Sequence, residues 1–171
     1  AWVTWKKLGD QAEYIPMKAG SVAPENIIGK NIYCVDYVPP QSSFNDLVSK
    51  NKSVFVIDHH ASNEVVVRGL HDFRFDVNKC GSVLAWEYFF PDQSIPMLLR
   101  YVQDVDIWQW KLEHSSELSM YTELTETTFE SWDKLVADIE NEQTRAEIIT
   151  QASFVVKYSD KQVKEIIESG K

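Results

Sequence analysis

The continuous apolar run Ser53-Val54-Phe55-Val56-Ile57 constrains the fold of this chain more than any other feature. The run is short and rich in β-branched and aromatic residues, which predicts a strand buried on both faces. Such strands are typical of parallel sheets that helices cover on each side. Short β-rich and helical runs alternate up to about residue 90, so we predict an α/β fold with a mostly parallel β-sheet flanked by helices.

The remaining elements are expected from the same patterns. Further strands are expected at residues 13–17, 31–36, 65–67 and 73–75. Helices are expected at residues 1–8, at 43–48 with Ser43 as the cap, and from Gly81-Ser82 onward. The C-terminal half is predicted to be helical, over residues 97–108, 118–126, 129–140 and 144–169. The apolar spacing of the last stretch loses its phase near residues 158–160, which predicts two helices or a kink.

Composition and charge narrow the classes of function. A hydrophobic content of 44% with 12% aromatic residues predicts a packed interior, and the length suits one domain. A net charge of -9 argues against nonspecific binding of duplex nucleic acid. Cys34 and Cys80 form no CxxC pair, so a reducing, cytoplasmic compartment is expected. No apolar run approaches the roughly 18 residues of a membrane span, and no membrane partner is expected.

Polar residues follow two neighbouring strands of the predicted sheet. Asp58-His59-His60 follows the buried run, and Asp36 ends the strand before it. Ligands of open α/β sheets bind at the carboxyl ends of the strands, so these side chains should meet at one rim. Adjacent residues of a regular strand point to opposite faces, so one histidine is expected to bind metal and the other to meet substrate. A carboxylate with imidazoles suits Mn²⁺ or Mg²⁺; the alternative is a pair of loop histidines bonded to backbone groups.

These residues resemble three motifs of the DHH phosphoesterase superfamily. Tyr33-Cys34-Val35-Asp36 resembles motif II, Asp58-His59-His60 resembles motif III, and Tyr101-Val102-Gln103-Asp104-Val105-Asp106-Ile107-Trp108 resembles motif IV. Their order and spacing agree with the family, as does the helix start at Gly81-Ser82. The superfamily includes RecJ-type exonucleases, nanoRNases, pAp phosphatases, cyclic dinucleotide phosphodiesterases and family II pyrophosphatases. The resemblance covers most of the chain.

The resemblance implies a set of metal ligands. Asp36 would bridge two metal ions, Mn²⁺ or Mg²⁺, and His59 would bind one of them. Asp104 resembles the motif IV ligand, with Asp106 as the alternative because the Asp-x-Asp spacing leaves the register open by two residues. The two ions would activate a water for in-line attack on phosphorus.

The resemblance also implies catalytic and substrate-binding residues. Asp58 would be a carboxylate near the ions that orients an imidazole. His60 would contact the substrate phosphate or the leaving oxygen. Gly81-Ser82 could bind a phosphate at the start of a helix, and a helix cap is the simpler alternative. Trp108 and Trp110 are expected to pack in the core, with stacking on a base as the alternative.

The family pattern also includes parts that this chain lacks. Motif I has no counterpart, and we expect it upstream of Ala1, with a substrate-binding domain beyond Lys171. Residues 1–171 would then be a truncated DHH phosphoesterase domain. The implied function is metal-dependent hydrolysis of short single-stranded oligonucleotides or nucleotide phosphates. Polyphosphate or pyrophosphate hydrolysis is one alternative, and a noncatalytic nucleotide-binding module is another. The oligomeric state is open, with a homodimer among the options.

Overall fold

The computed structural model describes residues 1–170, which divide into two compact units. The first unit comprises Ala1–Ile95 and the second begins at Pro96. Each unit has its own core, so each is described by itself. The expectation that residues 1–171 form one DHH phosphoesterase domain stays a prediction.

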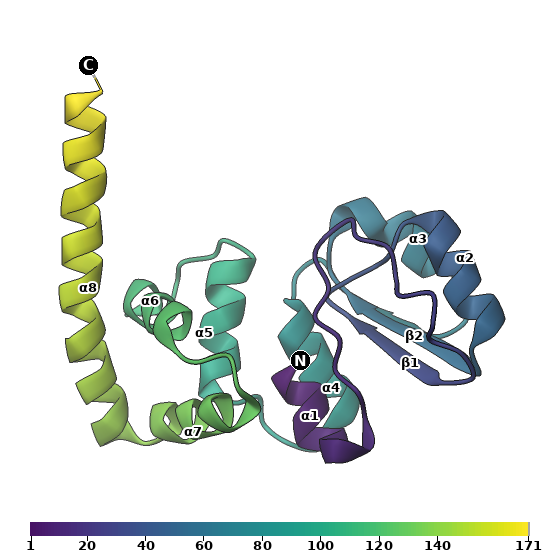
Figure 1. Ribbon diagram of the computed structural model, residues 1–171. Coiled ribbons are helices and arrows are strands. Elements are labelled where there is room, and N and C mark those ends of the chain that lie inside the picture. The colour runs from purple at the N-terminus through teal and green to yellow at the C-terminus, as the bar shows by residue number, and fades with distance from the viewer. Residues whose placement is uncertain (171) are drawn as a thin grey trace. The chain divides into compact units, whose positions relative to one another are not determined.

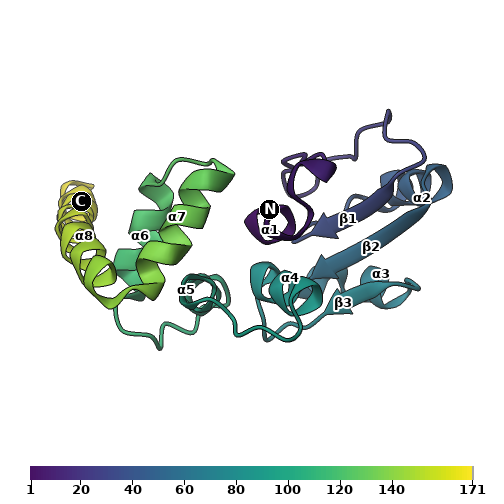
Figure 2. The same cartoon turned by 90° about the horizontal axis from the view of Figure 1, so that it is seen from below.

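A parallel three-stranded sheet with the order β1-β2-β3 organises the first unit (Figures 1 and 2). The strands are β1 (Asn31–Val35), β2 (Ser53–Asp58) and β3 (Phe73–Phe75). The central strand β2 is the apolar run of the sequence, and its residues Val56 and Ile57 are fully buried. The predicted α/β class, with a parallel sheet flanked by helices, is therefore confirmed.

Helices cover both faces of this sheet. The helices of the unit are α1 (Trp2–Leu8), α2 (Gln41–Lys50), α3 (Glu64–Arg68) and α4 (Gly81–Phe89). Phe44 of α2 and Val67 of α3 pack in one cluster with Cys34 and Val56 of the sheet. The opposite face carries Phe55, whose ring stacks on Tyr88 of α4 at 4.4 Å between centroids. Helix α1 lies beside α4 (Figure 2), where Trp2 stacks on Trp86.

Two predicted strands of this unit are wrong. Residues 13–17 are irregular and pair with no strand of the described chain. Residues 65–67 belong to helix α3, in which Val67 is fully buried and Val65 is exposed. Three β-branched residues favour a strand locally, but a helical turn can bury Val67 against the sheet, and tertiary packing overrides the propensity.

The predicted capping role of Ser43 is also wrong. Helix α2 begins at Gln41, directly after Pro40, so Ser43 lies inside the first turn. Its hydroxyl instead accepts a hydrogen bond from the backbone N–H of Ala23 at 2.8 Å. Ser43 therefore attaches the irregular segment before β1 to helix α2.

Four helices build the second unit, which confirms the helical C-terminal half. They are α5 (Met97–Asp106), α6 (Ser115–Leu124), α7 (Phe129–Glu140) and α8 (Glu142–Ser169). The buried residues of their shared hydrophobic cluster are Leu98, Leu118, Leu135, Ile139 and Ile148. The Asn141 side chain caps α8 by accepting hydrogen bonds from the N–H groups of Gln143 and Thr144.

Helix α8 is continuous, so the predicted division into two helices is wrong (Figure 1). Ala152, Val156, Ser159, Val163 and Ile166 are spaced alternately by four and three residues and lie on one face. The small polar Ser159 takes one position of this apolar stripe. The apolar spacing is therefore interrupted there in the sequence, although the helix continues. None of the helices in residues 1–170 combines the length and hydrophobicity that spanning a membrane requires.

We predict that Ile139→Ala lowers the free energy of unfolding by about 2–5 kcal/mol, because it leaves a cavity in the core of the second unit. Urea denaturation measures this loss. Ile166→Ala is the matched control, since Ile166 is 68% exposed on α8 and its truncation should change stability by less than about 0.5 kcal/mol. Equal losses of the free energy of unfolding in both variants would contradict the placement of Ile139 in a buried core.

Candidate metal centre

The pairing of β1 with β2 brings the predicted site residues of the first unit together. Val35, the last residue of β1, is in register with Ile57 of β2. The N–H of Asp36 continues this ladder by donating to the carbonyl of Ile57 at 2.8 Å. Asp36 therefore lies beside Asp58, His59 and His60 at the carboxyl end of the sheet.

Asp36, His59 and His60 form a compact group of potential metal ligands. Each offers one ligand atom, and these atoms lie within 4.8 Å of one another. Nε2 of His59 lies 3.2 Å from Oδ1 of Asp36, and Nδ1 of His60 lies 3.8 Å from the same oxygen. The side chain of His59 is only 10% exposed, whereas that of Asp36 is 50% exposed. One side of the group is therefore buried and the other is accessible from solvent.

Both histidines face Asp36, contrary to the expectation that they point to opposite faces. Strand β2 ends at Asp58, so His59 and His60 lie beyond the regular strand, where side chains no longer alternate. Their ring centroids are 4.4 Å apart, with the planes tilted by 47°. The loop backbone thus turns both imidazoles toward the same carboxylate.

Asp58 is a buried carboxylate that holds His60 in place. It is 0% exposed, and its Oδ1 lies 2.7 Å from Nδ1 of His60. Its Oδ2 accepts a hydrogen bond from the amide of Asn63 at 2.8 Å. A carboxylate in this position fixes the ring orientation of a histidine and favours a proton on the facing nitrogen. Sequence reasoning missed Asn63, because its contact depends on the 3₁₀ turn Ala61–Asn63.

Gly81 makes room for the Asp36 side chain at the start of α4. A Cβ atom at Gly81 would lie 2.7 Å from both Cβ and Oδ1 of Asp36, closer than real Cβ contacts. Asp36 itself has a φ of 58°, a left-handed conformation that aspartate tolerates better than most residues. The N-cap of α4 is Cys80, and Ser82 lies in the first turn, where its Oγ is 3.0 Å from Sγ of Cys80. Phosphate binding by Gly81 and Ser82 stays a prediction.

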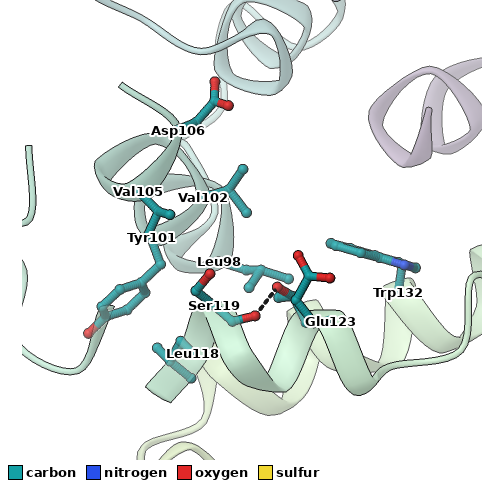
Figure 3. A pocket seen from close by; sticks show the side chains of 10 residues that line it. Leu98, Tyr101, Val102, Val105, Asp106, Leu118, Ser119, Glu123 and Trp132 are labelled. Carbon is teal, nitrogen blue, oxygen red and sulfur yellow. Dashed lines mark hydrogen bonds between the residues drawn. The ribbon is translucent and has the colours of Figure 1, made fainter. Parts of the chain in front are cut away.

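The two acids of the proposed motif IV lie on α5 in the second unit and differ in their surroundings. Asp104 is buried, and its carboxylate accepts hydrogen bonds from the N–H groups of Lys111 and Leu112 and from the hydroxyl of Ser115. Asp106 is exposed and lies at the edge of a pocket of about 200 Å³ (Figure 3). A role of either acid as a metal ligand stays a prediction.

Hydrogen bonds stabilise the charged form of Asp104. Burial works against that form, but the bonds from Ser115, Lys111 and Leu112 outweigh it and hold the pKa of the carboxyl below its ordinary value. Burial acts alone on Cys34 and raises the pKa of its thiol to about 12. This thiol therefore stays protonated at neutral pH, in line with the absence of a predicted thiolate site.

Comparisons with known proteins find distant similarity to a phosphodiesterase. No protein-family model matches this chain. It is 29% identical over 116 residues to the uncharacterised protein R106 of Acanthamoeba polyphaga mimivirus, which is 67% of this chain and 28% of that protein. It is 25% identical over 87 residues to a 3',5'-cyclic-nucleotide phosphodiesterase of Helicobacter pylori, which is 46% of this chain and 25% of that enzyme. The chain thus spans about a quarter of the length of the curated relatives it matches.

A solved structure also resembles part of this chain. It is the crystal structure of an uncharacterised protein from Helicobacter pylori G27, with a TM-score of 0.43 and 16% sequence identity. The likeness covers 74% of this chain and 41% of that one.

We predict that Gly81→Ala lowers the free energy of unfolding by about 1–3 kcal/mol, because the added methyl group overlaps Asp36. Gly69→Ala is the control, since a Cβ there meets only backbone oxygens at 3.4 and 3.5 Å. In an Asp36→Gly background the overlap is gone, so Gly81→Ala should cost much less. Chemical denaturation of wild type, the Gly81→Ala and Asp36→Gly variants and the double variant measures the coupling between the two positions. Strictly additive losses of the free energy of unfolding would contradict the overlap.

We predict that Asp104→Asn lowers the free energy of unfolding by about 1–3 kcal/mol at pH 7, because an amide cannot accept all three bonds. A carboxyl with a lowered pKa stabilises the folded state above its unfolded pKa and loses that contribution as the pH falls. The difference from wild type should therefore shrink below about pH 4. Denaturation between pH 3 and 7 tests this, with the exposed Asp160→Asn as control. A difference that stays constant with pH would refute it.

Proposed function

We propose that Asp36, His59 and His60 bind a divalent cation and that the protein is a metal-dependent phosphoesterase of the DHH superfamily. The observation that carries this proposal is the convergence of one carboxylate and two imidazoles at the ends of two parallel strands, with ligand atoms within 4.8 Å. The distant similarity to a cyclic-nucleotide phosphodiesterase supports a reaction at phosphorus.

The chemistry of these three side chains suits Mn²⁺. Imidazole nitrogen and carboxylate oxygen together favour such an ion over Ca²⁺, which prefers oxygen ligands alone. The carboxylate of Asp58 behind His60 is the kind of partner that orients a ligating histidine. We expect Mn²⁺ to bind more tightly than Mg²⁺, because Mg²⁺ binds few imidazoles. The superfamily resemblance suggests a second ion in the intact protein.

The side chains of this chain would divide the work of hydrolysis. A bound divalent cation supplies Lewis-acid activation of water and stabilises charge on the phosphoryl oxygens. Asp36 and His59 would hold the ion. His60 would complete this ligand set or, as the superfamily resemblance implies, contact the substrate phosphate or the departing oxygen. Asp58 would fix the orientation of the His60 ring in either role.

We propose short single-stranded oligonucleotides or nucleotide phosphates as substrates. A net charge of -9 disfavours long polyanions at long range, whereas a bound cation attracts a small phosphate locally. A cytoplasmic location fits the two buried cysteines, neither of which forms a disulfide.

We predict that the protein binds Mn²⁺ and that Asp36→Ala and His59→Ala abolish saturable binding in isothermal titration calorimetry. Asp58→Asn should weaken binding by about 10- to 100-fold, since it loosens His60 without removing a ligand. His71→Ala and Asp72→Ala are matched controls, because these two exposed residues lie outside the group of ligands. Circular dichroism would verify that each variant is folded.

Hydrolysis is measured on a panel of phosphoesters with Mn²⁺ present. Wild type should release mononucleotides or phosphate, and the Asp36 and His59 variants should not. Mn²⁺ binding without turnover of any phosphoester or of pyrophosphate would favour the noncatalytic nucleotide-binding module. Wild-type affinity for Mn²⁺ in both variants would refute the site itself.

A further inference from the structure

Two tryptophans on the loop after α5 are exposed, although the sequence favoured a place in the core. Trp108 is 80% exposed and Trp110 is 46% exposed. Large aromatic side chains gain stability from burial, so exposure of two neighbouring indoles in a folded unit requires an explanation. A binding surface is one such explanation.

The loop holds these indoles in a strained but well-fixed conformation. Trp108, Trp110 and His114 have φ angles of 56°, 51° and 68°, which bulky residues rarely adopt. Such strain persists only where surrounding interactions impose it, and it is common at functional sites.

Asp104 supplies the interactions that impose this conformation. Its backbone carbonyl accepts the N–H groups of Gln109 at 2.8 Å and Trp110 at 3.2 Å. Its carboxylate accepts the N–H groups of Lys111 and Leu112 at 2.9 and 3.1 Å. One buried residue therefore organises the backbone that presents both indoles, which lowers the entropy that a ligand must overcome.

The arrangement of the two rings favours a flat ligand. The ring centroids are 6.1 Å apart and the planes meet at 72°, so the edge of one indole packs on the face of the other. The outer faces remain open, and an open indole face is a stacking surface for a planar ring.

The residues between and after the indoles favour a nucleotide. Gln109 and Lys111 are exposed and alternate with Trp108 and Trp110. An amide can bond to the edge of a base, and an ammonium group can pair with a phosphate.

We propose that the loop formed by residues 107–112 binds a nucleobase by stacking on Trp108 and Trp110, with Lys111 near the phosphate. The base belongs to a free nucleotide or to a short single strand. The net charge of -9 disfavours a long polyanion. This inference concerns binding alone and holds whether or not the protein hydrolyses phosphoesters.

Fluorescence anisotropy of a labelled single-stranded hexanucleotide tests the proposal, in EDTA so that no metal ion bridges and no hydrolysis occurs. Trp108→Ala and Trp110→Ala should each weaken binding by roughly 5- to 100-fold, the range of one base stacked on an aromatic ring. Trp108→Phe should retain most of the affinity. Phe154→Ala and Tyr158→Ala remove exposed aromatic rings from α8 and should leave binding unchanged.

Competition assays identify the group that is recognised. An abasic strand of equal length should compete poorly, because it has phosphates but no rings. Competition by a mononucleotide would assign the loop to free nucleotides, and competition by oligonucleotides alone would assign it to single strands. No binding in EDTA, equal competition by the abasic strand, or full affinity in both alanine variants would overturn the proposal. So would tryptophan-dependent binding to lipid vesicles in place of nucleotides. None of these results bears on Mn²⁺ binding at Asp36, which calorimetry tests separately.

Discussion

The parallel pairing of β1 with β2 is the constraint on which the candidate metal centre depends. Parallel strands end at the same edge of a sheet, so the residues that follow them are neighbours even though 22 positions separate Asp36 from Asp58. Packing fixes the register, because a shift by one residue would remove Val56 from its cluster with Phe44 and Val67. The geometry of Asp36 and the histidines thus follows from packing elsewhere in the sheet.

The sequence predicted those parts of the fold in which local preference and burial agree. The strands at Asn31–Val35 and Ser53–Asp58 and the helix at Phe129–Glu140 were recognised because their patterns match their packing. Val65 to Val67 was misread, because one buried valine in a helical turn outweighs the strand preference of all three residues. The continuity of α8 was missed because Ser159 interrupts an apolar stripe whose spacing it preserves. Such errors arise where tertiary packing outweighs local preference.

The sequence also predicted only part of the candidate site. The proximity of Asp36 to His59 and His60 follows from strand topology alone. The role of Gly81 does not, since a glycine at a helix start has many explanations and only coordinates reveal the overlap with Asp36. The exposure of Trp108 was also beyond sequence reasoning, because it depends on a loop conformation that the contacts of Asp104 with residues 109–112 impose.

The carboxylates of Asp36, Asp58 and Asp104 differ in their surroundings. Asp58 and Asp104 are both buried, and hydrogen bonds from the protein engage both oxygens of each. A buried carboxylate needs such donors, because an unpaired charge in the interior is costly. Asp36 differs: it is half exposed, and Nε2 of His59 and Nδ1 of His60 lie within 4 Å of its Oδ1. Imidazole nitrogens around an accessible carboxylate can share a cation with it, and this difference in environment makes Asp36 better suited than Asp58 or Asp104 to bind a metal ion.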